Sequence, residues 1–190
     1  MIQTGKGDAS MVYILLATGF EEMEALVPAD LLHRAGVKVA LVGLDTPSVT
    51  GSHSISVNTD LTADQVTLTS DDMLLLPGGM VGVTNLSKSD TATALIQTAY
   101  ETGCWLAAIC AAPTLLGQLG LLQDRKAICY PGMEDRLIGA TVVDENVVID
   151  DRIITSRAAG TAYDFGLTLV ALLTSQSKSE EVRHGIKYRT

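Results

Sequence analysis

Cysteine and histidine are the residue types that most often supply nucleophiles and their bases, and this 190-residue chain has three of each. Cys110 lies between an apolar run typical of a strand and one typical of a helix, in LAAICAAPTLL (106–116). A thiol at the start of a helix beginning near Ala112 faces free backbone N–H groups and the positive end of the helix dipole, which lower its pKa. The sequence therefore predicts a reactive thiol at Cys110, with a small core residue as the alternative.

A histidine base for this thiol is not evident. His33 falls within a predicted helix, His53 in a loop and His184 near the C-terminus, and no two have the spacing of metal ligands. A cysteine–histidine triad is therefore not favoured, and no metal or other cofactor is expected. Cys104 follows a predicted helix and Cys129 lies within a predicted strand, so both are expected to be structural.

Three glutamates, Glu21, Glu22 and Glu24, open the helix that follows the first predicted strand. Acidic residues in a first helical turn interact favourably with the helix dipole, which accounts for two of them. A carboxylate facing the crevice would instead be desolvated, so that its pKa would rise and it could act as a general acid or base beside Cys110. Helical periodicity leaves open which of the three faces inward.

A Pro-Gly-Gly sequence at 77–79 ends another predicted strand and exposes backbone N–H groups. Gly78 and Gly79 could hold an oxyanion there, with the N–H of Ala111 as a further donor, or they could form only a tight turn. The GxGxxG pattern is absent, because the next glycine is Gly82. A dinucleotide site is therefore not predicted.

The elements that must position these residues alternate along the chain. Buried strands are predicted over 12–18, 37–44, 72–79, 105–110 and 126–130, helices over 21–36, 90–102, 112–120 and 162–174, and short strands within 45–70 and 140–156. Apolar strands that alternate with helices indicate an α/β fold with a parallel sheet covered on both faces. Ligands bind beyond the carboxyl ends of such strands, where Gly78, Gly79 and Cys110 are expected to meet.

Length and composition indicate one domain over 12–175, after a disordered leader at 1–11 and before a C-terminal tail at 176–190. The formal net charge is -9 and the 13 lysines and arginines are scattered, so neither nucleic acid nor a membrane surface is an expected partner. The apolar run at 105–122 is interrupted by Pro113 and two glycines, which favours a buried strand and helix over a membrane span. An odd number of unpaired cysteines fits a reducing, cytoplasmic compartment.

Five blocks of the sequence resemble the ThiJ/PfpI superfamily, in the branch of the Parkinson-disease protein deglycase. In chain order they are GFEEMEAL (19–26), LLLPGGMVGVTNL (74–86), LAAICAAPTLL (106–116), YPGMED (130–135) and TSRAAGT (155–161). The resemblance implies a flavodoxin-like sheet sandwiched between helices, a homodimer, and an easily oxidised nucleophile at Cys110. It also implies that Glu21 hydrogen-bonds the thiolate and that Gly78, Gly79 and Ala111 surround an anion pocket.

The chain departs from the family pattern at several positions. Tyr130 stands where the family often has histidine, and Ala158 and Ala159 replace the Gly and Pro of the usual SRGPGT. Ala111 occupies the position after the cysteine, where protease-like members carry histidine. Peptidase activity is therefore not expected, although Tyr130 can still donate a hydrogen bond in the pocket.

Two functions are compatible with these residues. The resemblance favours glyoxalase- or deglycase-type chemistry on reactive dicarbonyls such as methylglyoxal or their adducts, with Cys110 as nucleophile and Glu21 moving the proton. The alternative is an oxidation-sensing protein with little turnover, in which Cys110 is oxidised to the sulfinate.

Overall fold

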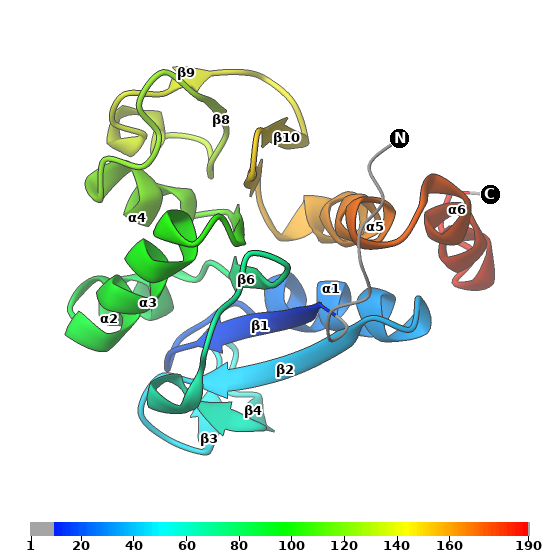
Figure 1. Ribbon diagram of the computed structural model, residues 1–190, viewed down its shortest axis with the longest axis horizontal. Coiled ribbons are helices and arrows are strands. Elements are labelled where there is room, and N and C mark those ends of the chain that lie inside the picture. The colour runs from blue at the N-terminus through cyan, green and yellow to red at the C-terminus, as the bar shows by residue number, and fades with distance from the viewer. Residues whose placement is uncertain (1–9, 190) are drawn as a thin grey trace.

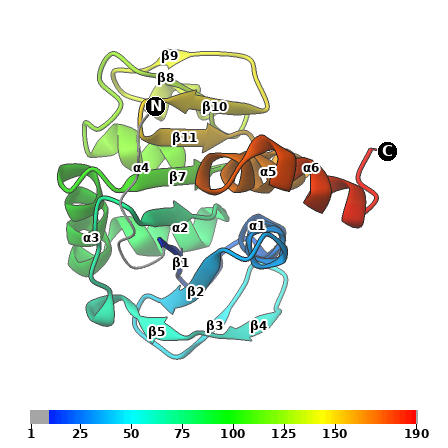
Figure 2. The same cartoon turned by 45° about the vertical axis from the view of Figure 1, so that its right-hand side comes forward.

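The fold is described by a computed structural model, which covers residues 10–189. At its centre lies a seven-stranded sheet of order β10-β11-β7-β6-β1-β2-β5, which runs from top to bottom in Figure 2. Its strands are β1 (Met11–Leu16), β2 (Lys38–Gly43), β5 (Leu61–Thr62), β6 (Met73–Leu76), β7 (Trp105–Ile109), β10 (Val147–Asp150) and β11 (Ile153–Ser156). All neighbouring strands are parallel except β10 and β11, which confirms the predicted sheet.

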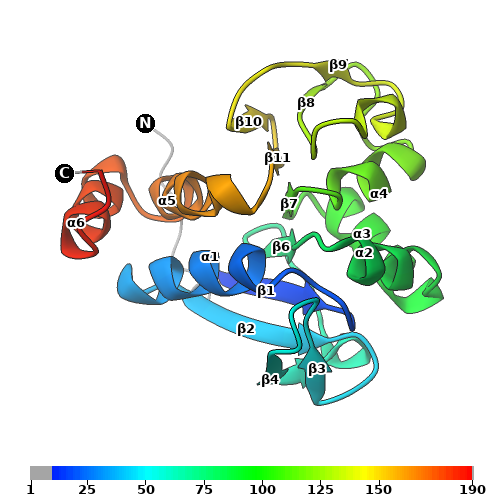
Figure 3. The ribbon, with the colours of Figure 1, turned by 180° about the vertical axis from the view of Figure 1, so that it is seen from behind.

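Helices cover both faces of the sheet (Figures 1 and 3). They are α1 (Glu22–Arg34), α2 (Met80–Ser87), α3 (Asp90–Glu101), α4 (Pro113–Gln118), α5 (Ala162–Leu173) and α6 (Gln176–Gly185). Side chains alternate along each strand, so that Ile14 and Leu16 of β1 pack with α1, α5 and α6, whereas Leu15 packs with α2, α3 and α4. Burial on both faces explains why the central strands are continuous apolar runs.

The segment 126–130 is a correction to the predicted sheet. Only β8 (Lys126–Ala127) forms a strand there, and it pairs with β9 (Thr141–Val142) in a separate small sheet. Beyond it, the N–H of Ile128 donates to Oγ1 of Thr155 and the N–H of Tyr130 donates to the Cys110 carbonyl. These two N–H groups bond to a side chain of β11 and to the turn after β7, and it is β11 that pairs with β7.

The remaining short elements lie around the sheet. In the predicted short-strand region, β3 (Ser48–Thr50) and β4 (Ser56–Asn58) form an antiparallel hairpin. Three 3₁₀ turns are η1 (Ala63–Gln65), η2 (Glu134–Arg136) and η3 (Ala159–Thr161). The apolar run at 105–122 is β7 followed by α4, as predicted, and no helix within residues 10–189 is long and apolar enough to cross a membrane.

Both ends of the chain differ from expectation within the described residues. Most of the expected leader lies outside them, and β1 already begins at Met11. The segment expected as a C-terminal tail contains α6, which packs against α5. Ser179 donates to the Leu167 carbonyl at 2.8 Å, and Val182 is buried among the side chains of that face.

Candidate active site

Cys110 lies in the sharp turn between β7 and α4. Its φ of 65° is in the left-handed region, which residues other than glycine seldom adopt. Its N–H donates to the Ser156 carbonyl at 2.9 Å, and its own carbonyl accepts from the N–H of Tyr130 at 2.8 Å. Of the three cysteines, Cys104 and Cys129 are buried and Cys110 is partly exposed. The turn therefore presents this one thiol at the carboxyl end of the sheet.

Glu24, in the first turn of α1, is the carboxylate that meets this thiol. Its side chain is only 1% exposed, and its Oε2 accepts from the N–H of Gly78 at 2.8 Å. The Cys110 thiol donates a second hydrogen bond to it, and the backbone of Ala159 a third. Burial is the dominant effect, and it raises the pKa of Glu24 to about 7. The carboxyl group is thus suited to accept and return a proton near neutral pH.

The structure corrects the assignment of Glu21 as the partner of the thiol. Glu21 is the N-cap of α1, and its Oε2 accepts from the N–H of Glu24 at 2.8 Å. Its backbone is extended, with φ -87° and ψ 122°, so its side chain turns back over the end of the helix. Capping the helix therefore occupies Glu21, while Glu24, one turn further on, reaches Cys110.

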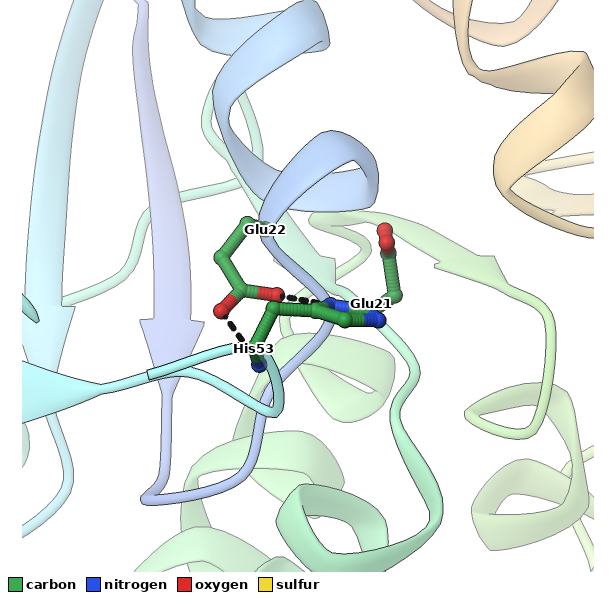
Figure 4. A group of neighbouring side chains, drawn as sticks. All are labelled: Glu21, Glu22 and His53. Carbon is green, nitrogen blue, oxygen red and sulfur yellow. Dashed lines mark hydrogen bonds and ion pairs between the residues drawn. The ribbon is translucent and has the colours of Figure 1, made fainter. Parts of the chain in front are cut away.

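The third glutamate, Glu22, binds the turn between β3 and β4 (Figure 4). Its carboxylate accepts from the His53 N–H at 2.7 Å, lies 2.8 Å from Nδ1 of the same residue and 3.2 Å from Oγ of Ser52. Burial favours its protonated form, but the hydrogen bonds from His53 and Ile55 outweigh burial and lower the pKa of Glu22 to about 2. Although Glu21, Glu22 and His53 could each offer a ligand atom within 4.8 Å of the others, hydrogen bonding already explains this cluster.

The thiol pKa also departs from the prediction. Burial raises the pKa of Cys110 to about 12, and the negative charge and hydrogen bond of Glu24 act in the same direction. The backbone N–H groups of Gly79 and Ala111 oppose this, as predicted, but α4 is only six residues long and its dipole is small. A standing thiolate is therefore disfavoured while Glu24 is ionised. The arrangement suits removal of the thiol proton by Glu24 as a bond to sulfur forms.

Two glycines of the PGG turn have different tasks. The N–H of Gly79, whose φ is 87°, faces the thiol as expected for an anion donor. The N–H of Gly78 is occupied by Glu24 instead. A Cβ at Gly78 would lie 2.5 Å from Oε2 of Glu24 and 2.7 Å from Cβ of Cys110. Gly78 therefore allows the carboxyl and the thiol to meet.

Substituting Gly78 by alanine is expected to push this pair apart. Overpacking should destabilise the fold by about 1–3 kcal/mol and alter the pH dependence of Cys110 alkylation, since both neighbours of the new methyl group must move. Denaturant unfolding and alkylation by iodoacetamide measure the two effects. Gly185→Ala is the matched control, because a Cβ there meets no atom within 4 Å. Equal behaviour of the two variants would contradict this account of Gly78.

A cavity of about 310 Å³ opens beside the thiol. It is lined by Met80, Cys110, Ala111, Tyr130, Pro131, Gly132, Met133 and Arg136. Ala111 and Tyr130 therefore lie in the pocket as predicted, and within residues 10–189 no histidine lines it. Larger cavities of about 380 and 590 Å³ lie near the ends of β1 and β2 and between α5 and α6, but neither contains a cysteine.

Among the pocket residues that sequence reasoning did not single out are Met80 and Arg136. Met80 begins α2, a helix that was not predicted, and Arg136 directly follows the YPGMED block. The continuation of that block into η2 was the available signal for Arg136.

Comparison with known proteins places the chain among relatives over nearly its whole length. A model described as the DJ-1/PfpI family matches residues 10–172. Protein dj-1beta of Drosophila melanogaster is 37% identical over 176 residues, which are 91% of this chain and 94% of the relative. A glutathione-independent glyoxalase of Caenorhabditis elegans is 31% identical, with 91% and 93% covered. A deglycase of Pyrococcus horikoshii is 34% identical, with 85% and 98% covered.

Solved structures agree with these matches. The crystal structure of Drosophila melanogaster DJ-1beta superposes with a TM-score of 0.89 at 34% identity, covering 96% of this chain and 100% of that one. A structure of Toxoplasma gondii DJ-1, described as oxidized, gives a TM-score of 0.87 at 30% identity, covering 96% and 100%.

Proposed function

The chain belongs to the DJ-1/PfpI family, and on that basis we propose that it acts on reactive 2-oxoaldehydes such as methylglyoxal, or on their early adducts, by glyoxalase- or deglycase-type chemistry. The contact between the Cys110 thiol and the buried Glu24 carboxyl, at one end of an open pocket, is the observation that carries the proposal. Relatives named as a glyoxalase and a deglycase support the reaction type.

In the first step, Sγ of Cys110 attacks the aldehyde carbon while the Glu24 carboxylate takes the thiol proton. The pKa of Glu24, about 7, makes this transfer feasible near neutral pH. The aldehyde oxygen develops negative charge, and the N–H groups of Gly79 and Ala111 are the nearest backbone donors to the sulfur. Protonation of that oxygen gives a hemithioacetal.

In the second step, Glu24 removes the proton from the former aldehyde carbon and a proton is returned to the neighbouring ketone carbon. The aldehyde carbon is oxidised to a thioester and the ketone carbon is reduced to an alcohol, so the electrons balance within the substrate. Water then hydrolyses the thioester and releases a 2-hydroxy acid, which is lactate for methylglyoxal. The free thiol is regenerated.

Lactate formation from methylglyoxal by the purified full chain, without added glutathione, tests the proposal. A second experiment supplies the adduct of methylglyoxal with N-acetylcysteine. The rate of adduct loss with the protein is compared with the rate of adduct loss with a scavenger that removes free methylglyoxal equally fast. Adduct loss faster than scavenging supports deglycase action, and equal loss supports glyoxalase action alone. A full chain that forms lactate no faster than buffer would exclude the glyoxalase reaction.

The oxidation-sensing alternative uses the same site. Cys110 is the partly exposed cysteine, and the N–H groups of Gly79 and Ala111 could bind sulfinate oxygens. Cys104 and Cys129 are buried, which shields both thiols from a dissolved oxidant. Mass spectrometry after mild peroxide should then find two added oxygens on Cys110 before the other cysteines. Equal oxidation of all three would exclude a sensing role.

A homodimer is part of the same proposal, and the structure offers a face for it. Met23 and Ile55, with side chains 47% and 53% exposed, and Tyr163 surround an apolar groove of about 320 Å³ on α1. The groove also contains Asp30, whose carboxylate pairs with Arg34 on the same helix. Light scattering should report a dimer for the natural chain and a smaller mass for Met23→Glu. A monomeric natural chain would contradict this assignment.

A further inference from the structure

Arg136 is a cationic group in the Cys110 pocket that the mechanism above does not use. Within residues 10–189, five of the seven arginines form ion pairs with carboxylates. A sixth, Arg152, lies over the ring of Trp105 at 4.8 Å. Arg136 has neither kind of partner among the described residues. Its guanidinium is therefore available to a ligand in the pocket.

The backbone that carries Arg136 is fixed to the element that carries Cys110. In η2, the Arg136 N–H donates to the Met133 carbonyl at 3.0 Å. A Cβ at Gly117 of α4 would lie 2.3 Å from the Arg136 carbonyl oxygen, so this glycine permits close packing of η2 on α4. At the other end of the loop, the N–H of Tyr130 donates to the carbonyl of Cys110. The thiol and the guanidinium are thus held by one connected piece of backbone.

The other pocket walls define what kind of molecule would use both groups. Met80, Tyr130, Pro131 and Met133 line the same cavity as the thiol and the guanidinium and present mainly apolar atoms to it. Methylglyoxal is small and neutral, so it offers Arg136 no charge to bind. A carboxylate or phosphate matches the planar fork of a guanidinium and forms two parallel hydrogen bonds with it. On a protein of net charge -9, an exposed arginine without an ion pair among the described residues, at the wall of the reactive pocket, is a specific feature.

We infer that the preferred substrates of this site carry an anionic group, carboxylate or phosphate, on the carbon chain of the 2-oxoaldehyde, and that Arg136 binds this group while Cys110 attacks the aldehyde. This inference rests on the proposed function. For 4,5-dioxopentanoate, addition of one water molecule would give 2-hydroxypentanedioate by the steps described above, with no external oxidant. Arg136 would then determine specificity, and Cys110 and Glu24 would perform the chemistry.

Alkylation of Cys110 tests anion recognition without turnover. Iodoacetate and iodoacetamide carry out the same substitution, but only iodoacetate is charged. The rate of Cys110 alkylation by iodoacetate, divided by the rate by iodoacetamide, is followed by peptide mass spectrometry. This ratio should fall about fivefold to tenfold in Arg136→Gln, as expected when one charge-assisted contact is lost. Arg136→Lys should retain part of the ratio. Arg34→Gln, which removes the same charge at the far end of α1, should leave it unchanged.

Turnover provides the second arm. The ratio of kcat/KM for 4,5-dioxopentanoate to that for methylglyoxal should fall by a similar factor in Arg136→Gln, mainly through KM. Protection of Cys110 from iodoacetate by acetate or by inorganic phosphate distinguishes a carboxylate site from a phosphate site. If neither ratio responds to Arg136→Gln, the inference is overturned even when methylglyoxal is consumed. If the alkylation ratio responds but no 2-oxoaldehyde is consumed, anion recognition stands and the proposed function fails.

Discussion

Replacing Cys110 by alanine is expected to reduce lactate formation from methylglyoxal by a factor of about 10³ or more, because no other residue of 10–189 that lines the pocket carries a thiol. Glu24 alone cannot replace the thiol. Without the sulfur no hemithioacetal forms, so the carboxylate has no proton to remove in the second step. The fold should persist, because the substitution removes only the sulfur atom of a partly exposed side chain.

Cys104→Ala and Cys129→Ala are the matched controls for this loss. Both side chains are buried and lie outside the pocket. These substitutions should therefore lower the rate only as far as they lower the amount of folded protein. Lactate assays at equal concentrations of folded protein, checked by circular dichroism, separate the two effects. Persistent Cys110-independent turnover would show that the chemistry lies elsewhere in the molecule.

Replacing Glu24 by glutamine is expected to lower the rate by about 10²–10⁴, the usual contribution of a positioned acid–base group. The amide keeps the size of the side chain but cannot take the thiol proton. In the natural protein the rate should rise with pH through about 7, as Glu24 loses its proton and becomes the base. Glu24→Gln should lose this dependence. Rate measurements on both proteins between pH 5 and pH 9 test this expectation.

Glu21→Gln provides the discriminating comparison. The amide oxygen of glutamine can still accept from the Glu24 N–H, so the substitution should cost at most about 1 kcal/mol of stability and leave most activity in place. Loss of activity in Glu21→Gln with full activity in Glu24→Gln would restore the original assignment of the thiol partner.

Stability should respond to Glu24→Gln in the opposite sense to activity. The folded-state pKa of Glu24, about 7, exceeds the ordinary value of about 4.5 for a glutamate. Its contribution to stability is therefore fully present below about pH 4.5 and is lost as the pH rises through 7. At pH 8 the neutral glutamine should be more stable than the buried carboxylate by up to about 3 kcal/mol. Urea unfolding at pH 5 and pH 8 measures the difference.

The central sheet could be predicted from the sequence because its strands are buried on both faces. Continuous apolar runs such as 12–18 and 105–110 carry that signal unambiguously. The segment 126–130 is also apolar, but its hydrogen bonds are directed to β9, to the side chain of Thr155 and to the carbonyl of Cys110, and not to β7. These hydrogen-bond partners are set by tertiary contacts, so the local sequence pattern does not predict them. The predicted position of Cys110 at a strand-to-helix turn was correct.

The partner of the thiol could not be predicted in the same way. The side chains of Glu21 and Glu24 point in different directions, because Glu21 has an extended backbone and Glu24 is already helical. The prediction of a lowered pKa for the Cys110 thiol was also wrong. Burial and the facing Glu24 carboxylate raise this pKa by more than the N–H groups at the start of the helix lower it. Two helices were missed for a simpler reason. In α2 the sequence MVGVTNLS has a weak helix-forming tendency, and α6 is polar apart from residues such as Val182.

The left-handed backbone at Cys110 sets stability and chemistry against each other. A residue with a Cβ at φ 65° costs about 1–3 kcal/mol relative to relaxed backbone, whereas glycine adopts this conformation freely. A relative freed from selection for the reaction would therefore gain stability by exchanging this cysteine for glycine, and alanine would retain the backbone cost without the sulfur. The sulfur of Cys110 is thus held at this turn at a cost in stability that glycine would not incur.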